Sequence, residues 1–537
     1  MKRVSLKIIS LVCVIVFLGG CIQKTVQTDN SSKTAVRNYP IFDIGIMPHD
    51  LKMLDVKVQN NVNYLIPLFE GLVVKDENGK ITPGLSESWK LSKDQTSLTF
   101  KIRDDAIWSD GSSITANNFV DFFKNVLCEK DSLYSNQLYY IKGAGSYRNG
   151  KSKFDSVGIK AIDRKTLQIS LESQCSYFLD ILSQGAFRLR KFDDNITNYK
   201  SEYNKIKYSG AYTIKKVDSS GDMTLVKNEN YWNKNTVKSD SVMLQSKESS
   251  EENLVSFNYK KIDLFTDIPS SQWSNLDKSK NIFKKNLSNI YGLAFNMNKQ
   301  NIALDTNFRN AISSSIDRRK LALDTLKGSY NFADTYIPHD VSGPFNAIYQ
   351  NKIYFNLLNL QDIKYYYSKA LTQNKDEEFK LIYISSVENK KICDSISTDI
   401  REKSGLHVDS QGYTFNEFEK KVASGDYDLA QININAFYDQ PEALLEIWKT
   451  NSDFNKFGYN DAEFNNQVDA IKLEKNAAKR NEAVRKAEDM LMQKLPFIPI
   501  FNFSSDICIS SNVKGVYVSK NGEIIINSAY LIDPIKS

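Results

Sequence analysis

Apolar and polar positions alternate over several short stretches of the chain. Leucine, phenylalanine and isoleucine alternate with other residues over 98–102, and the same alternation recurs over 167–171 and 524–526. Successive side chains of a strand point to opposite faces, so this pattern predicts strands with one buried face.

Other segments show the wider spacing of an amphipathic helix. Over 116–127, apolar side chains recur every three to four residues after Thr115, which can cap the start of a helix. A second helix is predicted near 477–494, ended by Pro496, and a short one over 417–424, ended by Gly425. Strands and helices therefore alternate between residues 38 and 537, which predicts an α/β fold.

Composition narrows the class of protein. The chain has 537 residues, of which 41% are hydrophobic and 25% charged, with 23 Gly, 11 Pro and 6 Cys. These values exclude disordered, collagen-like and disulfide-knot proteins. The 70 Lys and Arg against 64 Asp and Glu give a net charge of +6, of which Lys2, Arg3 and Lys7 account for three. The rest is spread along the chain without a basic cluster, so no nucleic-acid partner is expected.

The N-terminus has the features of an export signal. A basic start is followed by an apolar run over 8–18 and by Leu-Gly-Gly-Cys over 18–21. This ending resembles a bacterial lipobox, which implies a lipoprotein signal peptide over 1–20 and diacylglycerol on Cys21. An ordinary signal peptide with an incidental cysteine is the alternative. The polar segment up to residue 37 predicts a flexible, lipidated tether.

Candidate catalytic and metal motifs are sparse. The three histidines, His49, His339 and His407, are isolated, and neither HExxH nor GxSxG occurs. Four further cysteines lie far apart without a CxxC pair, so zinc is not expected and buried free thiols are favoured (Cys128, Cys175, Cys393, Cys508). We expect no metal, no cofactor and no enzymatic activity.

One segment matches a phosphate-binding motif. Residues 145–152 read Gly-Ser-Tyr-Arg-Asn-Gly-Lys-Ser, which fits G-x-x-x-x-G-K-[ST]. That motif requires a following helix whose N-terminus faces the phosphate, whereas the alternation over 157–162 indicates a strand. The sequence therefore predicts a surface loop here.

A series of short segments carries a family resemblance. They read Leu-Phe-Glu-Gly-Leu over 68–72, Pro-Gly-Leu-Ser-Glu-Ser-Trp over 83–89, Trp-Ser-Asp-Gly over 108–111, Gly-Ala-Tyr-Thr-Ile over 210–214 and Asn-Glu-Asn-Tyr-Trp over 228–232. Later segments continue in the same order, among them Arg-Asn-Ala-Ile over 309–312 and Gly-Asp-Tyr-Asp over 425–428. Together they resemble the extracytoplasmic oligopeptide-binding proteins of ABC importers, the peptide/nickel-type solute-binding proteins of family 5.

The resemblance implies a fold and a division of the chain. We expect a two-lobe, periplasmic-binding-protein-like α/β fold of type II (a Venus flytrap) with an extra α+β subdomain on lobe I. Lobe I would comprise 38–70, 196–288 and 499–537, the subdomain 71–195, and lobe II 289–498. Chain crossings near 288 and 498 would form the hinge, and ligand would favour the closed state.

The resemblance also implies a function. The chain would be a lipid-anchored, monomeric protein that captures oligopeptides in the cleft and delivers them to ABC permease subunits. The Lys-, Asn- and Ile-rich sequence resembles low-GC Gram-positive proteins, which implies attachment to the outer face of the cell membrane. One alternative keeps the fold with a modified or signalling peptide, a metal chelate or another non-peptide solute as ligand. Another is a lipid-anchored enzyme or receptor without transport.

The expected cleft departs from the family pattern. Members that hold a free peptide amine have Asp in Trp-x-Ala-Asp-Tyr-x-x-Pro, whereas 434–441 reads Ile-Asn-Ala-Phe-Tyr-Asp-Gln-Pro. Phe437 thus replaces the Asp and Ile434 the Trp, while Tyr438 matches. Either Asp439 takes over the amine, or the ligand has no free ammonium there, because a buried unpaired charge is costly. Simple core packing is the alternative for Phe437.

Further ligand contacts are implied by position. Gln431 stands where a basic residue is common, and Phe415 where the family has another cleft tryptophan. An early loop with Gln59, Asn60 and Asn61 would face the cleft, as would the last crossing with Phe501, Asn502 and Phe503. For Phe501 and Phe503 the alternative is that they only pack the hinge.

Overall fold

The computed structural model describes most of the chain. It covers residues 36–45, 47–53, 62–129, 133–247, 249–266, 268–269, 271–279, 281–326, 330–333, 335–339, 341, 354, 360–371, 379–436, 438–474 and 476–536. The predictions for the signal peptide, Cys21, Gln59, Asn60, Asn61 and Phe437 lie outside these residues.

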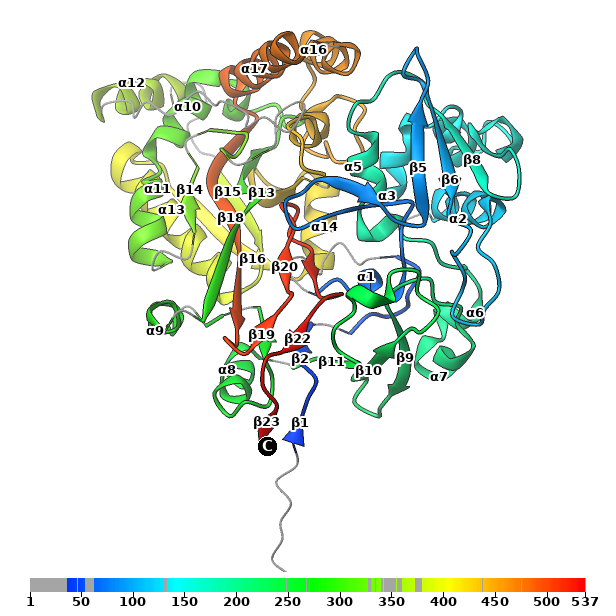
Figure 1. Cartoon of the computed structure of the whole chain (residues 1–537). Helices are drawn as coiled ribbons and strands as arrows, with labels where there is room; N and C mark the ends of the chain where they lie inside the picture. Colours follow the sequence, from blue (N-terminus) through cyan, green and yellow to red (C-terminus); the bar gives the residue numbers. More distant parts are fainter. Residues whose placement is uncertain are drawn as a thin grey trace, which may run out of the picture.

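An 11-stranded sheet runs through the molecule in the order β16-β15-β17-β13-β18-β12-β2-β11-β10-β9, with β14 beside β18 (Figure 1). The strands are β2 (Ile41–Asp43), β9 (Tyr212–Val217), β10 (Met223–Lys227), β11 (Ser241–Gln245), β12 (Leu264–Phe265), β13 (Ile282–Phe295), β14 (Asn331–Phe332), β15 (Phe379–Ile384), β16 (Val408–Tyr413), β17 (Leu429–Asn435) and β18 (Phe497–Ile509).

Two long antiparallel strands join the halves of this sheet. β13 has 14 residues and β18 has 13, and their pairing extends from Ile282 opposite Cys508 to Ala294 opposite Phe497. The register shifts between Asn286 and Ile290. On one side of this shift β13 also pairs with β17, and at the other end β18 pairs with β12. We call the part with β2 and β9–β12 lobe I, and the part with β15–β17 lobe II.

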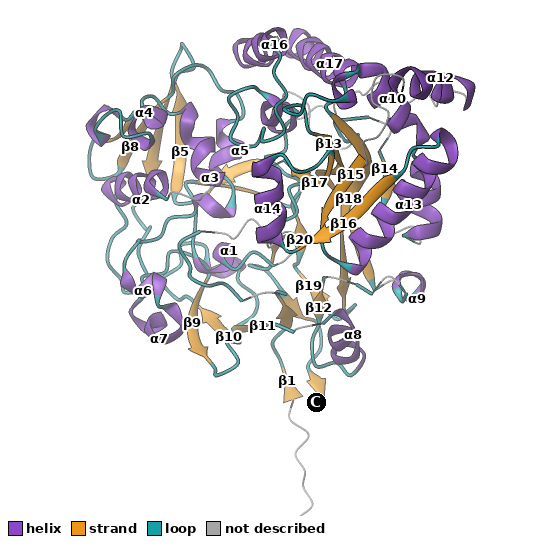
Figure 2. Ribbon diagram, turned by 180° about the vertical axis from the view of Figure 1, so that it is seen from behind, coloured by secondary structure: helices purple, strands orange, loops and turns teal. Residues whose placement is uncertain are grey.

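Helices cover both faces of lobe II (Figure 2). They are α10 (Thr306–Ser315), α11 (Arg318–Lys320), α12 (Leu360–Leu371), α13 (Val387–Ser404), α14 (Phe415–Ser424), α15 (Glu442–Leu445), α16 (Ala462–Leu473) and α17 (Ala477–Lys494). The predicted helix 477–494 is confirmed. The predicted helix 417–424 begins two residues earlier, because Thr414 accepts a bond from the Glu417 amide and Glu417 bonds back to the Thr414 amide.

A separate four-stranded sheet, β5-β6-β8-β7, belongs to the extra subdomain. Its strands are β5 (Ser86–Leu91), β6 (Ser97–Ile102), β7 (Ile159–Ala161) and β8 (Thr166–Ser170), and α2 (Ala116–Cys128) packs beside them. The strands predicted from alternation are confirmed, as is the helix, whose N-terminus Thr115 and Asn118 cap reciprocally. Phe119, Phe122, Phe123 and Val126 are all buried, as their spacing requires.

The phosphate-motif segment is not the loop that we expected. Residues Ala144–Arg148 form the short helix α4, which follows directly from the helical turn η1 (Gln137–Tyr140) and the Ile141–Gly143 link. The strand predicted after the motif is present as β7 and is preceded only by the three-residue turn η2, so the helix that a phosphate cradle requires after Lys151 and Ser152 is not formed. A phosphate cradle is therefore absent from this part of the described chain.

Shorter elements complete the described structure. The helices are α1 (Leu65–Leu68), α3 (Leu133–Asn136), α5 (Phe178–Leu182), α6 (Asp194–Thr197), α7 (Tyr199–Glu202), α8 (Ser250–Asn258) and α9 (Trp273–Lys278). Further turns of helix are η2 (Phe154–Ser156), η3 (Gly185–Phe187), η4 (Tyr203–Lys205), η5 (Lys234–Thr236), η6 (Ile302–Leu304), η7 (Leu321–Thr325) and η9 (Glu446–Trp448). The remaining strands are β1 (Val36–Arg37), β3 (Val73–Lys75), β4 (Ile81–Pro83), β19 (Val513–Lys514), β20 (Tyr517–Val518), β21 (Ile524–Ile525), β22 (Tyr530–Leu531) and β23 (Ile535–Lys536).

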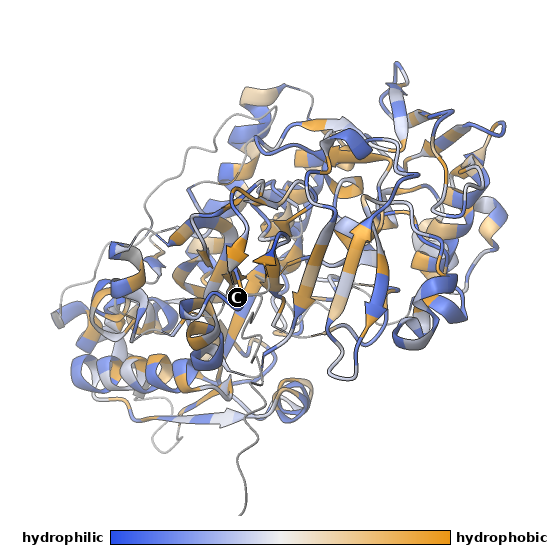
Figure 3. Ribbon diagram, turned by 60° about the horizontal axis from the view of Figure 1, so that its bottom comes forward, coloured by the Kyte–Doolittle hydropathy of each residue, from blue (hydrophilic) through white to orange (hydrophobic). Residues whose placement is uncertain are grey.

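The two ends of the described chain lie together at the lower end of lobe I (Figure 1). β1 pairs antiparallel with β23, and Arg37 forms a buried ion pair with Asp263 at 2.5 Å. Hydrophobic residues concentrate in the strands and hydrophilic residues cover much of the outer helices (Figure 3). Searching the described residues for a helix long and apolar enough to cross a membrane gives none.

The four cysteines of the folded part are free thiols. Cys175, Cys393 and Cys508 are buried as expected. Cys128 is exposed at the C-terminal end of α2, so the expectation of a buried thiol is wrong there.

Candidate functional site

The edge of lobe II that faces lobe I collects the ends of parallel strands. β15 pairs in parallel with both β16 and β17, so their C-terminal ends lie at one edge of the sheet. β13 and β18 leave lobe II through this same edge. Segments that follow β15, β16 and β17 therefore face the crevice between the lobes, the usual place of a ligand in such sheets.

The structure brings several predicted residues to this edge. Phe415 directly follows β16 as the first residue of α14 and is 39% exposed. Ile434 lies near the end of β17 and is buried, and Tyr438 and Asp439 come just after that strand. Asn502 lies on β18 opposite Ile290 of β13, close to the same edge.

Two buried amide side chains, Gln431 in the first half of β17 and Asn502 on β18, keep an acceptor atom with no hydrogen-bond partner among the described residues. Gln431 Nε2 donates to Asn433 Oδ1 at 3.0 Å, while Gln431 Oε1 has no partner. Asn502 Oδ1 likewise has no hydrogen-bond partner among the described residues. Buried polar atoms without partners are costly, so these two oxygens remain able to accept a hydrogen bond near the crevice.

The predicted phenylalanines of the last crossing lie in an aromatic cluster. Phe501 is buried, with its ring centroid 5.6 Å from that of Tyr291 and 5.8 Å from that of Tyr330. Phe503 is half-buried and packs against the same two tyrosines. In this structure both residues pack the crossing strands, and a contact of either with a ligand stays a prediction.

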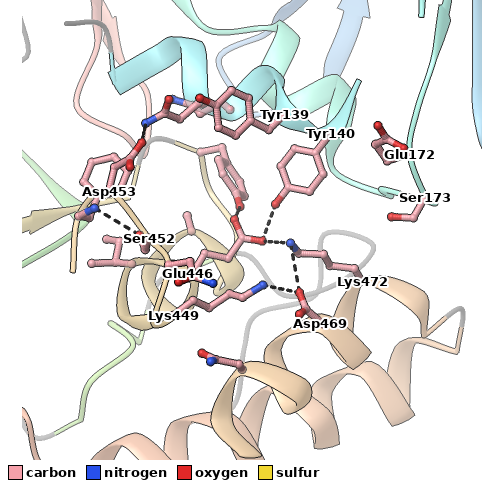
Figure 4. Close-up of a pocket in the computed structure, with 18 residues that line it drawn as sticks. Tyr139, Tyr140, Glu172, Ser173, Glu446, Lys449, Ser452, Asp453, Asp469 and Lys472 are labelled. Atoms are coloured by element: carbon pink, nitrogen blue, oxygen red, sulfur yellow. Dashed lines mark hydrogen bonds and ion pairs between the residues drawn. The ribbon is translucent and has the colours of Figure 1, made fainter. Parts of the chain in front are cut away.

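A polar pocket lies between the subdomain and lobe II (Figure 4). Its volume is about 480 Å³, within the range of small-ligand sites. One wall comes from residues 136–140 with Glu172 and Ser173, and the other from residues between Tyr438 and Lys472. Because the two walls belong to different parts of the molecule, the pocket exists only where those parts meet.

The Glu446 carboxylate in the pocket accepts hydrogen bonds from residues of both walls. Tyr140 of the subdomain donates to Glu446 Oε1 at 2.5 Å, and Tyr438 donates to Glu446 Oε2 at 3.2 Å. Lys472 lies 2.9 Å from Glu446 Oε1 (Figure 4). Burial, reinforced by the Glu446 charge, holds the pKa of Tyr140 and Tyr438 well above the usual tyrosine range, so both hydroxyls stay protonated donors.

Aromatic stacking extends the same contact. The Tyr177 ring of the subdomain stacks on the Tyr438 ring with centroids 5.0 Å apart and planes inclined by 10°. The Tyr140 and Tyr177 hydroxyls lie 2.9 Å apart. Lys472 places its ammonium 5.0 Å from the centroid of the Tyr140 ring. The subdomain and lobe II thus meet through buried rings whose polar ends converge on one carboxylate.

A second buried ion pair lies behind this layer. Arg480 Nε donates to Glu442 Oε1 at 2.7 Å, and both side chains are buried in lobe II. The Arg480 guanidinium also donates to Ser176 Oγ of the subdomain and lies 5.3 Å from the Tyr177 ring centroid. Burial raises the pKa of Glu442, and the Arg480 charge opposes that rise. Arg480 therefore compensates Glu442 and touches the subdomain at once.

Asp439 has partners on both sides of the crossing. Ser288 of β13 donates to Asp439 Oδ1 at 3.2 Å, and Lys520 lies 3.4 Å from Asp439 Oδ2. The Asp439 side chain is 9% exposed, whereas the Lys520 side chain is 32% exposed. The candidate amine partner named from the sequence thus already has a cation beside it.

Sequence reasoning missed the residues that join the two walls. Tyr140, Tyr177, Lys472, Arg480 and Lys520 were not expected at a site. Glu442 and Glu446 are four residues apart, which indicates that they share a helix face. The hydrogen bond from Tyr140 to Glu446 joins residues 306 positions apart, so no local sequence pattern predicts it. A search of the described chain for three or more His, Cys, Asp or Glu grouped as metal ligands finds no such group.

Comparisons with known proteins give a consistent result. The sequence model for the middle region of the bacterial extracellular solute-binding proteins of family 5 matches residues 80–456. The oligopeptide-binding protein OppA of Bacillus subtilis is 26% identical over 480 residues, covering 86% of this chain and 87% of OppA. The dipeptide-binding protein DppE of the same organism is 25% identical, covering 85% and 86%.

Solved structures show the same fold. The murein tripeptide-binding protein MppA of Escherichia coli superposes with a TM-score of 0.80 at 22% identity, covering 93% of this chain and 99% of MppA. An oligopeptide-binding protein of Borrelia burgdorferi gives a TM-score of 0.77 at 24% identity, covering 92% and all of that chain. The expected two-lobe α/β fold with an extra subdomain is therefore confirmed.

Proposed function

Because the chain belongs to the bacterial extracellular solute-binding proteins of family 5, we propose that it captures oligopeptides between its lobes and delivers them to the permease of an ABC importer. The observation that carries this proposal is the pocket whose walls come from the subdomain and from lobe II. A ligand that touches both walls favours the closed arrangement, and a transporter can read that change of state.

The crevice offers the chemistry that an extended peptide needs. Asn433 is exposed and Asn435 half-buried at the end of β17, next to the unpaired Gln431 oxygen. Such groups, with free strand-edge backbone, hydrogen-bond to a peptide main chain whatever its sequence. The pocket of about 480 Å³ leaves room for side chains and bridging water, which allows several sequences to bind.

We further infer the lobe boundaries stated from the sequence: 38–70, 196–288 and 499–537 for lobe I, 71–195 for the subdomain and 289–498 for lobe II. The register shift between Asn286 and Ile290 of β13 supports a first crossing near 288. Asn502 still pairs with Asn331 of β14, which argues for a second crossing a few residues beyond 498.

We also propose that Cys21 carries lipid and holds a monomeric protein on the outer face of a Gram-positive cell membrane. The described chain starts at the lower end of lobe I, where β1 pairs with β23 (Figure 1). This end lies opposite α16, which borders the pocket (Figure 1). Mass spectrometry of the mature protein from its host tests the anchor: diacylglycerol on Cys21 supports it, and an unmodified Cys21 contradicts it.

Native mass spectrometry tests the ligand class. Residues 22–537, purified without lipid, should carry a set of masses that denaturation releases as peptides of varied sequence. Protein refolded without ligand should then bind a synthetic peptide library by calorimetry. A single non-peptide mass, or no binding by any peptide, would contradict oligopeptide capture. Loss of uptake of the released peptides on deletion of the gene would support delivery to a permease.

A further inference from the structure

Three acidic residues that come shortly after β17 each have a cation supplied by another segment. Asp439 faces Lys520, Glu442 faces Arg480, and Glu446 faces Lys472. Glu446 lines the pocket, Glu442 is buried in lobe II, and Asp439 lies beside the crossing strand β13. Each of the three charges thus has an opposite charge beside it within the protein, so none of the three offers a ligand a free carboxylate.

Lys520 is held in place by the fold around it. It lies in the turn that joins β20 to β21, and its carbonyl accepts the Ser288 amide at 3.1 Å. Glu523 of the same turn accepts the Gly185 amide at 2.9 Å and the Asn63 side chain at 2.8 Å. A methyl group on Gly185 would lie 2.2 Å from Asn63 Nδ2 and 2.8 Å from Glu523 Oε1, so the absence of a side chain at Gly185 allows this close approach. The turn is thus attached to the crossing strand and to the subdomain, which fixes the backbone that carries the Lys520 ammonium.

This arrangement bears on how a peptide can be recognised. A free peptide has an N-terminal ammonium, and a carboxylate in a dry wall is its strongest partner. Beside Asp439, the position that a peptide ammonium would take is occupied by Lys520. Moving a cation away from a buried carboxylate is costly. Among the described residues no cation lies at contact distance from Glu172 or Asp453 on the pocket rim, but both carboxylates are exposed, where water screens their attraction for an ammonium.

We propose that Lys520 is a built-in counter-ion of Asp439, and that the protein therefore binds peptides without reading their N-terminal charge. This inference rests on the proposed function. Its consequence is that peptides with a blocked N-terminus are ligands equal to free ones. Recognition then comes from neutral hydrogen bonds and from the closing of the subdomain on lobe II.

Matched peptides test the inference. One sequence is prepared with a free and with an acetylated N-terminus, and both are titrated by calorimetry into wild type, Lys520→Met and Lys514→Met. Lys514 is exposed on β19, forms no ion pair with any residue that the structure describes, and serves as the control. Wild type and control should bind both forms within about threefold of each other, whereas Lys520→Met should prefer the free amine by about tenfold or more, because Asp439 then lacks its cation.

Two results would overturn the inference while the proposed function stands. One is a wild type that prefers the free amine by about tenfold or more. The other is a Lys520→Met variant that shows no new preference. If wild type binds neither peptide nor any other, the proposed function fails, and the inference fails with it.

A ligand-free measurement tests the ion pair itself. Lys520→Met should lower the melting temperature more than Lys514→Met does, because a nearly buried carboxylate loses its cation. Adding Asp439→Asn should recover part of that loss, since the neutral amide needs no counter-ion. Equal melting temperatures for the single and double variants would show that Lys520 does not compensate Asp439, and would overturn the inference without any peptide.

Discussion

Lobe II meets the rest of the molecule at two junctions of opposite character. At the hinge, β13 and β18 run from one lobe into the other as paired strands, so the contact is continuous backbone. At the wall of residues 438–446, the described contacts with the subdomain are made by side chains, namely stacked tyrosines and Glu446, with Arg480 of α17 beside them. The first junction is continuous chain, so the proposed opening of the lobes would leave it in place and would separate only the second.

This difference separates stability from function. Backbone pairing and buried aromatic packing at the hinge contribute to folding in every state of the protein. Polar contacts between wall and subdomain contribute only when the two surfaces touch, so they set the balance between open and closed states. Substitutions at the hinge should therefore reduce the free energy of unfolding, and substitutions at the wall surface should reduce ligand affinity.

The largest effect is expected at the hinge. A methyl group on Gly292 of β13 would lie 2.2 Å from the Ile498 carbonyl oxygen and 2.4 Å from the Phe497 ring. Gly292→Ala should therefore lower the free energy of unfolding by more than about 3 kcal/mol in urea titrations. The control Gly145→Ala, in helix α4, meets nothing closer than 3.7 Å and should change stability by less than about 1 kcal/mol. Equal losses in the free energy of unfolding for Gly292→Ala and Gly145→Ala would contradict this prediction.

The buried pair behind the wall comes next. Arg480→Met leaves the buried Glu442 without its cation and should cost about 3–5 kcal/mol of unfolding free energy. The double variant Arg480→Met with Glu442→Gln should lose less, because no buried charge remains uncompensated. Lys479→Met, exposed on the same helix, is the matched control. A double variant as unstable as Arg480→Met would argue against charge compensation as the role of Arg480.

Substitutions at the surface of the wall should reduce ligand affinity and leave stability nearly unchanged. Tyr140→Phe removes a donor that reaches Glu446 only when the subdomain and lobe II touch. Peptide affinity should fall by about tenfold, with little change in urea unfolding of the free protein. Calorimetry with Tyr530→Phe, an exposed tyrosine far from the pocket, provides the comparison. Unchanged affinity together with a large loss of stability would place Tyr140 with the hinge residues instead.

The smallest effect is the pH dependence of stability that Asp43 causes, away from both junctions. Burial raises the pKa of Asp43 on β2 to about 6. The folded state then binds a proton more tightly than the unfolded state, so stability should fall as pH rises from about 4 to 6. Between pH 5 and pH 7 we expect a loss of about 1 kcal/mol from this group. Asp43→Asn should lack that part of the slope in unfolding titrations, and an unchanged slope would contradict the assignment.

Local sequence patterns predicted much of the fold. The spacing of four apolar residues after Thr115 gave helix α2, and alternation gave β6 and β8, because both signals depend on near neighbours alone. Helix α14 was predicted two residues short because the reciprocal bonds of Thr414 and Glu417, a sequence-readable cap, were overlooked. Helix α4 was missed because a five-residue helix presents too short a periodic pattern.

The site was predictable only in part, for a physical reason. Ile434 lies near the end of β17, and Phe415, Tyr438 and Asp439 come shortly after strands whose ends share the same edge, so a family motif could predict their place in the fold. The partners that give these residues their chemistry come from remote segments. Lys520 is 81 positions from Asp439, and Tyr177 stacks on Tyr438 across the gap between the subdomain and lobe II. Such pairs are set by tertiary packing, which leaves no trace in local spacing.

The central claim is that peptide brings the subdomain and lobe II together. Cys128 is an exposed free thiol on the subdomain, and Leu473 is exposed at the end of α16 on lobe II, so Leu473→Cys allows dyes to be attached to both sides. Single-molecule energy transfer between these positions measures their separation directly. The account predicts a population of longer separations without ligand that shifts to one short separation when peptide binds. A distribution that stays the same while calorimetry shows bound peptide would contradict it.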